Sequence, residues 1–168
     1  MEAEGVLEIL AALESAGVRV WLDGGWGVDA LLGAQSRDHA DLDLIVDIVH
    51  VQRLQETLVA IGYRLKPGGT TANFVLIDDG GRDVDVHPIE FDESGFGLFE
   101  LGDGRRWPFP AAAFEGQGVI CGREVLCLSP DAQVQCHAQG YTRTENDLRD
   151  MELLQQKFGV VLPIGLCR

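Results

Sequence analysis

The sequence predicts an α/β (α+β) domain with a small mixed sheet flanked by helices and a short helical C-terminal tail. Three observations predict it: an amphipathic helical pattern near the N-terminus, short β-branched runs that alternate with helical patterns, and a double glycine between a strand and a helix. At 168 residues the chain has the length of one domain. Its 46% hydrophobic and 24% charged residues are typical of globular proteins.

The first elements follow from apolar spacing and glycine breaks. Aliphatic residues recur at helical spacing over residues 4–16, and Gly17 supplies a C-terminal stop. Residues 18–22 are β-branched and aromatic, which predicts a strand. The glycines at 24–25 end that strand, and a short helix over 26–32 follows.

The middle of the chain predicts three strands and one helix. Apolar and acidic residues alternate over 41–46, as in a half-buried strand, and residues 51–61 repeat an amphipathic helical pattern. Two further strands, over 73–77 and 82–88, flank the sequence Asp-Asp-Gly-Gly at 78–81, a strong hairpin signal.

The last third is predicted from turn residues and a final helix. The chain is rich in glycine and proline up to Pro110, which predicts a loop, and a short strand pair follows around Val119 and Val125. Pro130 is suited to open one helix, and residues 145–158 form another. We therefore expect a core over residues 1–128 and a helical tail over 129–168 that is not an independent domain.

The charge balance disfavours binding to nucleic acid. The chain has 13 Lys+Arg against 27 Asp+Glu, a formal net charge of -14, whereas proteins held on nucleic acid by electrostatics need a basic face. An acidic cleft attracts a divalent metal ion or a cationic small molecule, although acidic charge can also serve solubility alone. The sequence shows no signal peptide and no membrane span, and its four cysteines lack metal or redox spacing. We expect a cytoplasmic protein with free thiols and no membrane partner.

The first candidate functional feature is the glycine pair that ends the first strand. Gly24 and Gly25 precede Trp26 at the start of a helix. Glycines let backbone N–H groups approach an anion closely, and a helix N-terminus adds partial positive charge. The pair could cradle the phosphates of a nucleotide, but taken alone it is better explained as a tight turn.

Two acidic strands supply the second feature. Period-two geometry places Asp41 and Asp43 on one face of their strand, and Asp83, Asp85 and His87 on one face of another. Neighbouring carboxylates repel unless a cation lies between them, so such a set is a candidate magnesium site. Each strand taken singly is better explained as a solvated polar face; the order and spacing of the glycine pair and the two acidic strands favour a joint site.

These residues resemble the antibiotic nucleotidyltransferases, and most closely the short lincosamide nucleotidyltransferases and the related aminoglycoside adenylyltransferases. The resemblance rests on Gly24-Gly25-Trp26-Gly27-Val28-Asp29-Ala30, then Arg37, His39, Asp41 and Asp43, and then Asp85-Val86-His87-Pro88. It implies the polymerase-β-like nucleotidyltransferase fold.

The resemblance also implies a two-metal mechanism. Two magnesium ions would be held by Asp41, Asp43 and Asp85, while a hydroxyl of the acceptor attacks the α-phosphorus of ATP or another NTP and pyrophosphate leaves. Asp85 is the candidate general base, with Glu90 in reserve.

Further residues receive binding roles. The nucleotide would be bound by Gly24, Gly25, Trp26, Arg37 and His39. The acceptor, a small antibiotic such as a lincosamide or an aminoglycoside, would be contacted by His87, Glu90, Trp107 and Asp147. The best-placed aromatic residue for lining a cleft is Trp107, because its segment is predicted to be a loop.

Two departures from the family pattern leave other functions open. Asn146 stands where relatives often have a lysine, and Asn73 where they often have an arginine. The alternatives are a degenerate or antitoxin-like module that binds nucleotide without turnover, and an enzyme that nucleotidylates a protein or a biosynthetic metabolite. Because so short a chain has little room for a separate acceptor domain, we also expect a homodimer.

Overall fold

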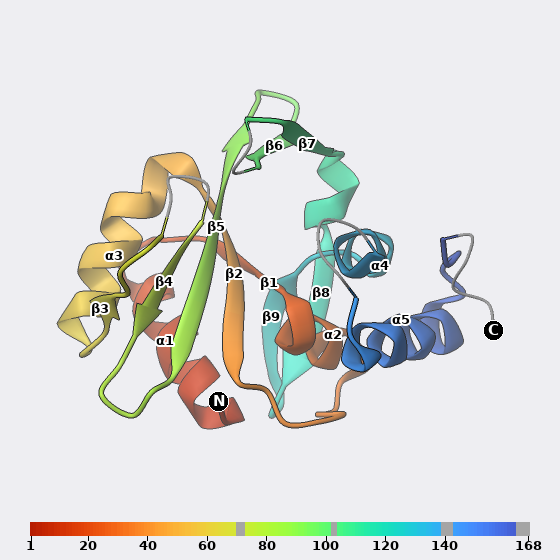
Figure 1. Cartoon of the computed structure of the whole chain (residues 1–168), viewed down its shortest axis with the longest axis horizontal. Helices are drawn as coiled ribbons and strands as arrows, with labels where there is room; N and C mark the ends of the chain where they lie inside the picture. Colours follow the sequence, from red (N-terminus) through yellow and green to blue (C-terminus); the bar gives the residue numbers. More distant parts are fainter. Residues whose placement is uncertain (70–72, 102–103, 139–142, 164–168) are drawn as a thin grey trace.

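A computed structural model of the chain describes residues 1–69, 73–101, 104–138 and 143–163. Within these residues the strands join into one mixed sheet, whose main path runs β3-β4-β5-β2-β1-β9-β8, with β6 and β7 attached to β5 (Figure 1). The strands are β1 (Val20–Asp23), β2 (Asp41–Asp47), β3 (Arg64–Leu65), β4 (Phe74–Ile77), β5 (Asp83–Phe91), β6 (Gly97–Glu100), β7 (Arg106–Phe109), β8 (Gly116–Ile120) and β9 (Arg123–Cys127).

Helices cover the sheet unequally. The helices are α1 (Ala3–Ser15), α2 (Gly24–Leu32), α3 (Val51–Ala60), α4 (Pro130–Ala138) and α5 (Glu145–Phe158), with short 3-10 turns η1 (Ile48–His50) and η2 (Ala111–Phe114). In Figure 1, α1 and α3 lie behind the sheet, α4 and α5 lie beside it, and no helix stands in front of β2 and β5. The front of these two central strands is therefore the side on which polar groups remain accessible.

The alternation of side chains along β2 and β5 explains this asymmetry. Leu42 and Leu44 of β2 and Val84 and Val86 of β5 are fully buried in the main core, which α1 and α3 complete. The intervening residues point to the other face. That face carries a smaller apolar cluster, built around Trp21, Ile45, Ile89, Phe109, Ala113, Leu128 and Ala132.

Most of the predicted elements are confirmed, and one helix begins earlier than expected. Gly24 and Gly25, predicted as the break before a helix, are themselves its first two residues. The reason is that Asp23 caps the helix: its carboxylate accepts a hydrogen bond of 2.8 Å from the Gly24 N–H.

Two predictions about the region after residue 88 are wrong. Strand β5 continues through Pro88 to Phe91. Pro88 lies between the residues that pair with β4 and those that pair with β6, so no pairing is lost on that side, and on the other side it lies opposite Val46 of β2. The expected loop before Pro110 contains the hairpin β6–β7 instead. Its Pro108 is tolerated because β7 pairs only with β6.

The tail packs closely on the rest of the chain. The core cluster includes Val134 of α4 and Met151 and Leu154 of α5, and the Gln133 amide donates to the Leu22 carbonyl at 3.2 Å.

The remaining expectations concern cysteines and membranes. Cys121, Cys127 and Cys136 are free thiols, whereas Cys167 lies outside the described residues. Among the described helices none has the length and apolar character needed to cross a bilayer.

Candidate active site

Parallel pairing of β2 with β5 brings the predicted carboxylates into register. Asp41 lies opposite Asp83, and Asp43 lies opposite Asp85. Neighbouring strands are about 4.8 Å apart, so residues that share a register position and a face are adjacent. Alternation predicts that the acidic residues of each strand share one face of that strand. The register shows in addition that the acidic residues of the two strands lie side by side.

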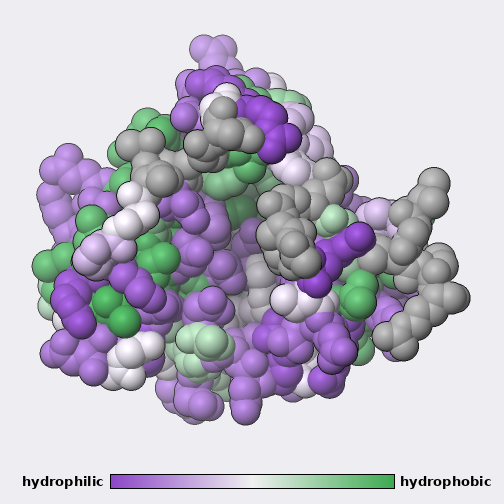
Figure 2. All heavy atoms as spheres, in the orientation of Figure 1, coloured by the Kyte–Doolittle hydropathy of each residue, from purple (hydrophilic) through white to green (hydrophobic). Residues whose placement is uncertain are grey.

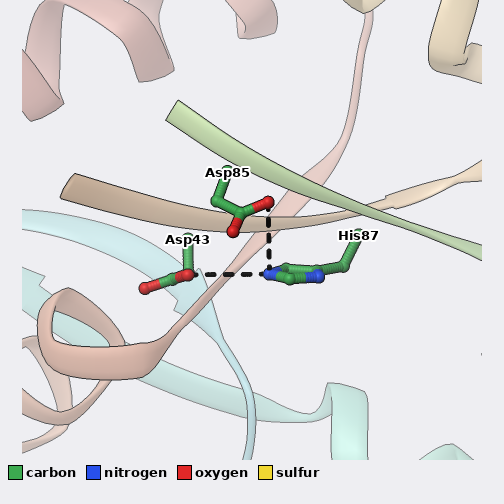
Figure 3. Close-up of side chains that lie close together, drawn as sticks. All are labelled: Asp43, Asp85 and His87. Atoms are coloured by element: carbon green, nitrogen blue, oxygen red, sulfur yellow. Dashed lines mark ion pairs between the residues drawn. The ribbon is translucent and has the colours of Figure 1, made fainter. Parts of the chain in front are cut away.

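A compact cluster forms from Asp43, Asp85 and His87. One ligand atom from each residue lies within 4.8 Å of those of the other two. The His87 Nε2 atom is 3.6 Å from Asp43 Oδ1 and 3.9 Å from Asp85 Oδ1, so both carboxylates face the same ring nitrogen (Figure 3). These side chains are 22–26% exposed. The cluster is thus accessible, but only partly hydrated.

Electrostatics in this cluster favour bound protons in the metal-free protein. Burial raises the pKa of Asp85, and Asp43 and Asp41 raise it further, while His87 opposes them. Burial alone would lower the pKa of His87, but the carboxylates of Asp43 and Asp85 outweigh it and raise that pKa to about 9. A positively charged imidazole therefore occupies the place between the two carboxylates at neutral pH.

Asp41 lies at the outer edge of the site. It begins β2 and is exposed, and it does not complete a three-residue cluster with Asp43 and Asp85 among the described residues. Partial desolvation by the neighbouring groups, and then the charge of Asp43, raise the pKa of Asp41. Its predicted role as a metal ligand stays a prediction.

The turn from β1 to α2 closes the site from one side. Gly24 has φ +59°, and a Cβ there would collide with Asp43 Oδ2. Asp23, which was not predicted as a site residue, is directly opposite Asp43 in the β1–β2 pairing. Burial, followed by the charge of Asp43, raises the pKa of Asp23. The signal that could have identified Asp23 is its position at the end of a strand, immediately before a double glycine.

Two predicted nucleotide contacts lie behind this turn. A Cβ on Gly25 would collide with His39 Nδ1 and would lie 2.7 Å from an Arg37 guanidinium nitrogen. The His39 ring is buried, and its Nε2 is bonded to the buried carboxylate of Asp29. Arg37 is paired with Asp150 of α5 at 2.8 Å. The side chains of His39 and Arg37 therefore pack against the glycine turn. The Arg37 side chain remains 19% exposed.

Trp26 is a core residue. It is 2% exposed, and its ring lies 4.8 Å from that of His39. Its side chain is therefore not available for stacking on a nucleobase, and what remains of its predicted role is the backbone at the start of α2.

Two of the predicted acceptor contacts, Glu90 and Trp107, lie on different strands. Glu90 lies on β5 with its carboxylate 3.4 Å from Arg106, and alternation turns it to the face opposite Asp85. Trp107 lies on strand β7, stacked on Phe109 with ring centroids 6.3 Å apart.

Asp147 is placed as a structural residue. It is 7% exposed, it caps α5 together with Thr144, and its Oδ1 is 2.9 Å from His137 Nδ1. Burial and these bonds give it a role in holding α4 and α5 together, and its predicted contact with the acceptor stays a prediction.

Two hollows are distinct on the surface. Seen from the side of Figure 1, the molecule is hollowed near its centre, between the part that carries β5 and the part that carries α4 (Figure 2). A separate groove of about 900 Å³ is lined by residues of α1, β1 and β9, and none of Asp43, Asp85 and His87 lines it. The candidate site on the carboxylate face is therefore separate from that groove.

The donor set fits a divalent cation. Carboxylate oxygens are the ligands that Mg²⁺ prefers, and imidazole nitrogen is a common ligand of first-row transition metals. Asp85 Oδ1 is buried and has no hydrogen-bond partner among the described residues, which leaves one acceptor unsatisfied inside the cluster. Asp43, Asp85 and His87 are the residues that could hold the ion.

Comparisons with known proteins identify the family. A family model for aminoglycoside-2''-adenylyltransferase matches residues 5–154. A lincosamide resistance protein from Staphylococcus haemolyticus is 33% identical over 147 residues, which cover 88% of this chain and 90% of that protein. A 2''-aminoglycoside nucleotidyltransferase from Klebsiella pneumoniae is 30% identical over 125 residues, which cover 74% of this chain and 66% of that protein. The crystal structure of the lincosamide antibiotic adenylyltransferase LnuA with lincomycin bound has a TM-score of 0.79 at 32% identity, covering 90% of this chain and 95% of that chain. The predicted fold and resemblance are confirmed.

Proposed function

The chain belongs to the aminoglycoside-2''-adenylyltransferase family, and from that premise we propose that it transfers AMP from ATP to a hydroxyl of a lincosamide or aminoglycoside antibiotic. It is a nucleotidyltransferase, and pyrophosphate is the other product of the proposed reaction. Adenylylation would remove the drug's ability to bind its target and so confer resistance. The observation that carries the proposal is the register that sets Asp43 beside Asp85, on the open face next to the glycine turn.

A pair of magnesium ions is the proposed cofactor. When bound, divalent cations would neutralise the triphosphate and stabilise both the attacking and the leaving oxygens of an in-line displacement. Asp43 and Asp85 supply the hard oxygen ligands such ions prefer, and Asp41 would extend the set at its outer edge.

Asp85 is the proposed general base. A base works best when its pKa approaches the working pH, and burial together with the charge of Asp43 raises the pKa of Asp85. Its carboxylate would accept the proton of the acceptor hydroxyl as that oxygen attacks the α-phosphorus. One P–O bond forms to the acceptor and the bond to pyrophosphate breaks.

We propose that the glycine turn binds the phosphates of the nucleotide. The N-terminus of α2 carries partial positive charge, and Gly24 and Gly25 leave no side chain between it and an anion. Arg37, which lies against Gly25 and is partly exposed, would add a cationic group as charge moves to pyrophosphate.

We propose that the working unit is a homodimer. Apolar side chains that are 45–74% exposed lie near both ends of α3: Ile48 and Val49 before its start, and Val59 and Ile61 near its end. Exposed apolar side chains of this kind supply area that a second chain would bury. Sedimentation as an 18.3 kDa monomer at assay concentrations would contradict the dimer without affecting the reaction.

Release of pyrophosphate tests the reaction. The protein is incubated with magnesium, ATP and a panel of lincosamides and aminoglycosides, and the adenylylated drug is identified by mass spectrometry. Asp43→Asn and Asp85→Asn are each expected to lower kcat by at least about 100-fold with the fold intact, because each removes charge from the metal site.

The matched control is Asp38→Asn, which alters an exposed carboxylate just before β2 and is expected to leave the rate unchanged. Wild-type rates in both site variants would refute the assignment of the site. Turnover with a protein or a biosynthetic metabolite, and with no drug, would refute the acceptor class alone.

A further inference from the structure

We infer that His87 is a metal ligand, and that its Nε2 makes the site prefer first-row transition-metal ions, such as Mn²⁺ and Co²⁺, to Mg²⁺. The inference rests on the proposed function for the presence of a divalent-cation site. It goes beyond that function in the identity of the third ligand and in the metal preference that follows from it.

The spacing of the three donor atoms suits a single ion. Ligands held at about 2.1 Å from a metal lie about 3.0 Å apart when adjacent in an octahedron, about 3.4 Å apart in a tetrahedron, and about 4.2 Å apart when opposite. The His87 Nε2 atom is 3.6 Å from Asp43 Oδ1 and 3.9 Å from Asp85 Oδ1. Both distances lie within that range, and all three donor atoms lie within 4.8 Å of one another, so the cluster could hold one ion.

The ring of His87 is oriented for this role. Nε2 is turned toward both carboxylates, as Figure 3 shows. The edge of the ring packs against Phe99 of β6, with centroids 5.8 Å apart and an interplanar angle of 75°. Because the β6 strand pairs with β5 at Ile89, the aromatic contact is fixed by the sheet itself. A histidine whose role was to bind the acceptor would have no reason to direct Nε2 at two carboxylates.

Asp85 Oδ1 faces the same point. In the metal-free protein this buried oxygen has no hydrogen-bond partner among the described residues, because the charged His87 Nε2, at 3.9 Å, is too far away to donate a hydrogen bond to it. An ion shared with His87 Nε2 would satisfy this oxygen.

The mixed donor set determines which ions bind best. Carboxylates alone suit Mg²⁺, whereas imidazole suits transition metals, whose affinities rise from Mn²⁺ through Co²⁺. Replacing His87 should therefore weaken binding of Mn²⁺ and Co²⁺ much more than binding of Mg²⁺.

Pulsed EPR of the full chain loaded with Mn²⁺ tests the ligation directly. Wild-type protein is expected to show ¹⁴N coupling from a bound imidazole, and His87→Asn is expected to lose it. Calorimetry should show Mn²⁺ and Co²⁺ binding weakened by about 10–100-fold in His87→Asn. Binding of Mg²⁺, measured by competition, should change by less than about threefold.

The matched control is His50→Asn, which removes the half-buried imidazole of η1, outside the cluster. It should retain both the nitrogen coupling and the affinities. Circular dichroism of each variant shows whether the fold is kept, and the wild-type EPR spectrum does not depend on any variant folding.

Wild-type protein that binds Mn²⁺ without nitrogen coupling would overturn the inference, as would equal losses of Mn²⁺ and Mg²⁺ affinity in His87→Asn. Magnesium-supported AMP transfer would survive either result, so the proposed function would stand. Absence of any divalent-cation binding would instead contradict both.

Discussion

Gly24 and Asp43 approach each other so closely that the turn between β1 and α2 has no room for a side chain. A Cβ on Gly24 would overlap Asp43 Oδ2, at a separation that no real Cβ contact shows. The residue also has φ +59°, a region that L-residues rarely adopt. Two independent constraints therefore require glycine at this position, one from the backbone and one from the site.

We predict that Gly24→Ala abolishes most activity, with a loss of at least about 100-fold in kcat/KM, because the methyl group must displace the Asp43 carboxylate. The control is Gly33→Ala, which has a similar φ of +73° and nothing within 4 Å of the added Cβ. Both variants carry backbone strain of about 1–2 kcal/mol, visible in thermal unfolding, but only Gly24→Ala touches the site. Equal activity losses in the two variants would contradict the role of the contact.

His87 should titrate with a pKa of about 9 in the metal-free protein, against about 6.5 in the unfolded chain. Because the folded pKa is the higher one, His87 contributes stability that is complete below about pH 6.5 and is lost as pH rises toward 9. Two-dimensional NMR of the imidazole follows this titration. In Asp43→Asn the pKa should fall, since one of the opposing carboxylates is gone. A wild-type value of 6.5 or lower would contradict the electrostatic account.

The sequence predicts the open face of this site better than its buried support. Alternation places Asp43 on the polar face of β2, and Asp85 and His87 on the polar face of β5, and the parallel pairing joins these two faces. It gives no information about the bond from His39 to Asp29 of α2, because that bond depends on how the chain returns from the helix to the strand. His39, assigned to the nucleotide on the resemblance, is consequently a buried residue beneath the turn.

Among the elements, α5 holds the segment between α2 and β2 in place. Arg37 of that segment is bonded to Asp150, and Arg149 donates to the Ser36 carbonyl at 3.1 Å. Lys157, near the other end of the helix, donates to the Leu32 carbonyl at 2.6 Å. The helix thus fixes the segment that leads into Asp41 and Asp43.

We predict that Asp150→Asn destabilises the protein by about 1.5–3 kcal/mol in urea unfolding, because Asp150 is 1% exposed and the change removes the negative charge that pairs with Arg37. The KM for ATP should also rise, since Arg37 lies against Gly25. The control is Asp79→Asn, whose ion pair with Arg64 is fully exposed on the Asp79 side and should contribute nothing measurable. A KM effect without destabilisation would mean that Asp150 acts on the nucleotide in another way.

Elements with regular patterns are predictable, whereas those set by tertiary pairing are not. The helix over 145–158 has the predicted bounds, because Thr144 caps it and Gly159 ends it in the left-handed conformation. The hairpin β6–β7 is missed, because its glycines and prolines indicate a loop until β5 supplies a partner strand. Pro88 misleads in the same way, since only the register shows that the strand continues past it by pairing with β2 and β6.

At the scale of the whole molecule, residues 1–128 and the described part of the tail, residues 129–168, contribute side chains to one hydrophobic core. The tail contributes Leu154, which is fully buried, and Met151, which is 1% exposed. Its contacts with α2 and with the segment before β2 support the glycine turn and the strand that carries Asp43. The stability of the tail and the geometry of the site are therefore coupled.

We accordingly predict that Leu154→Ala destabilises the whole chain by about 2–5 kcal/mol, because it opens a cavity in the shared core. Unfolding followed by far-ultraviolet circular dichroism and by tryptophan fluorescence should show a single coincident transition, since Trp26 belongs to the same cluster as Leu154. The control is Val161→Ala, which alters an apolar side chain that is 86% exposed and should change stability by less than about 0.5 kcal/mol. A tail that melts separately, with tryptophan fluorescence and nucleotide binding unchanged, would mean that residues 1–128 hold the site by themselves.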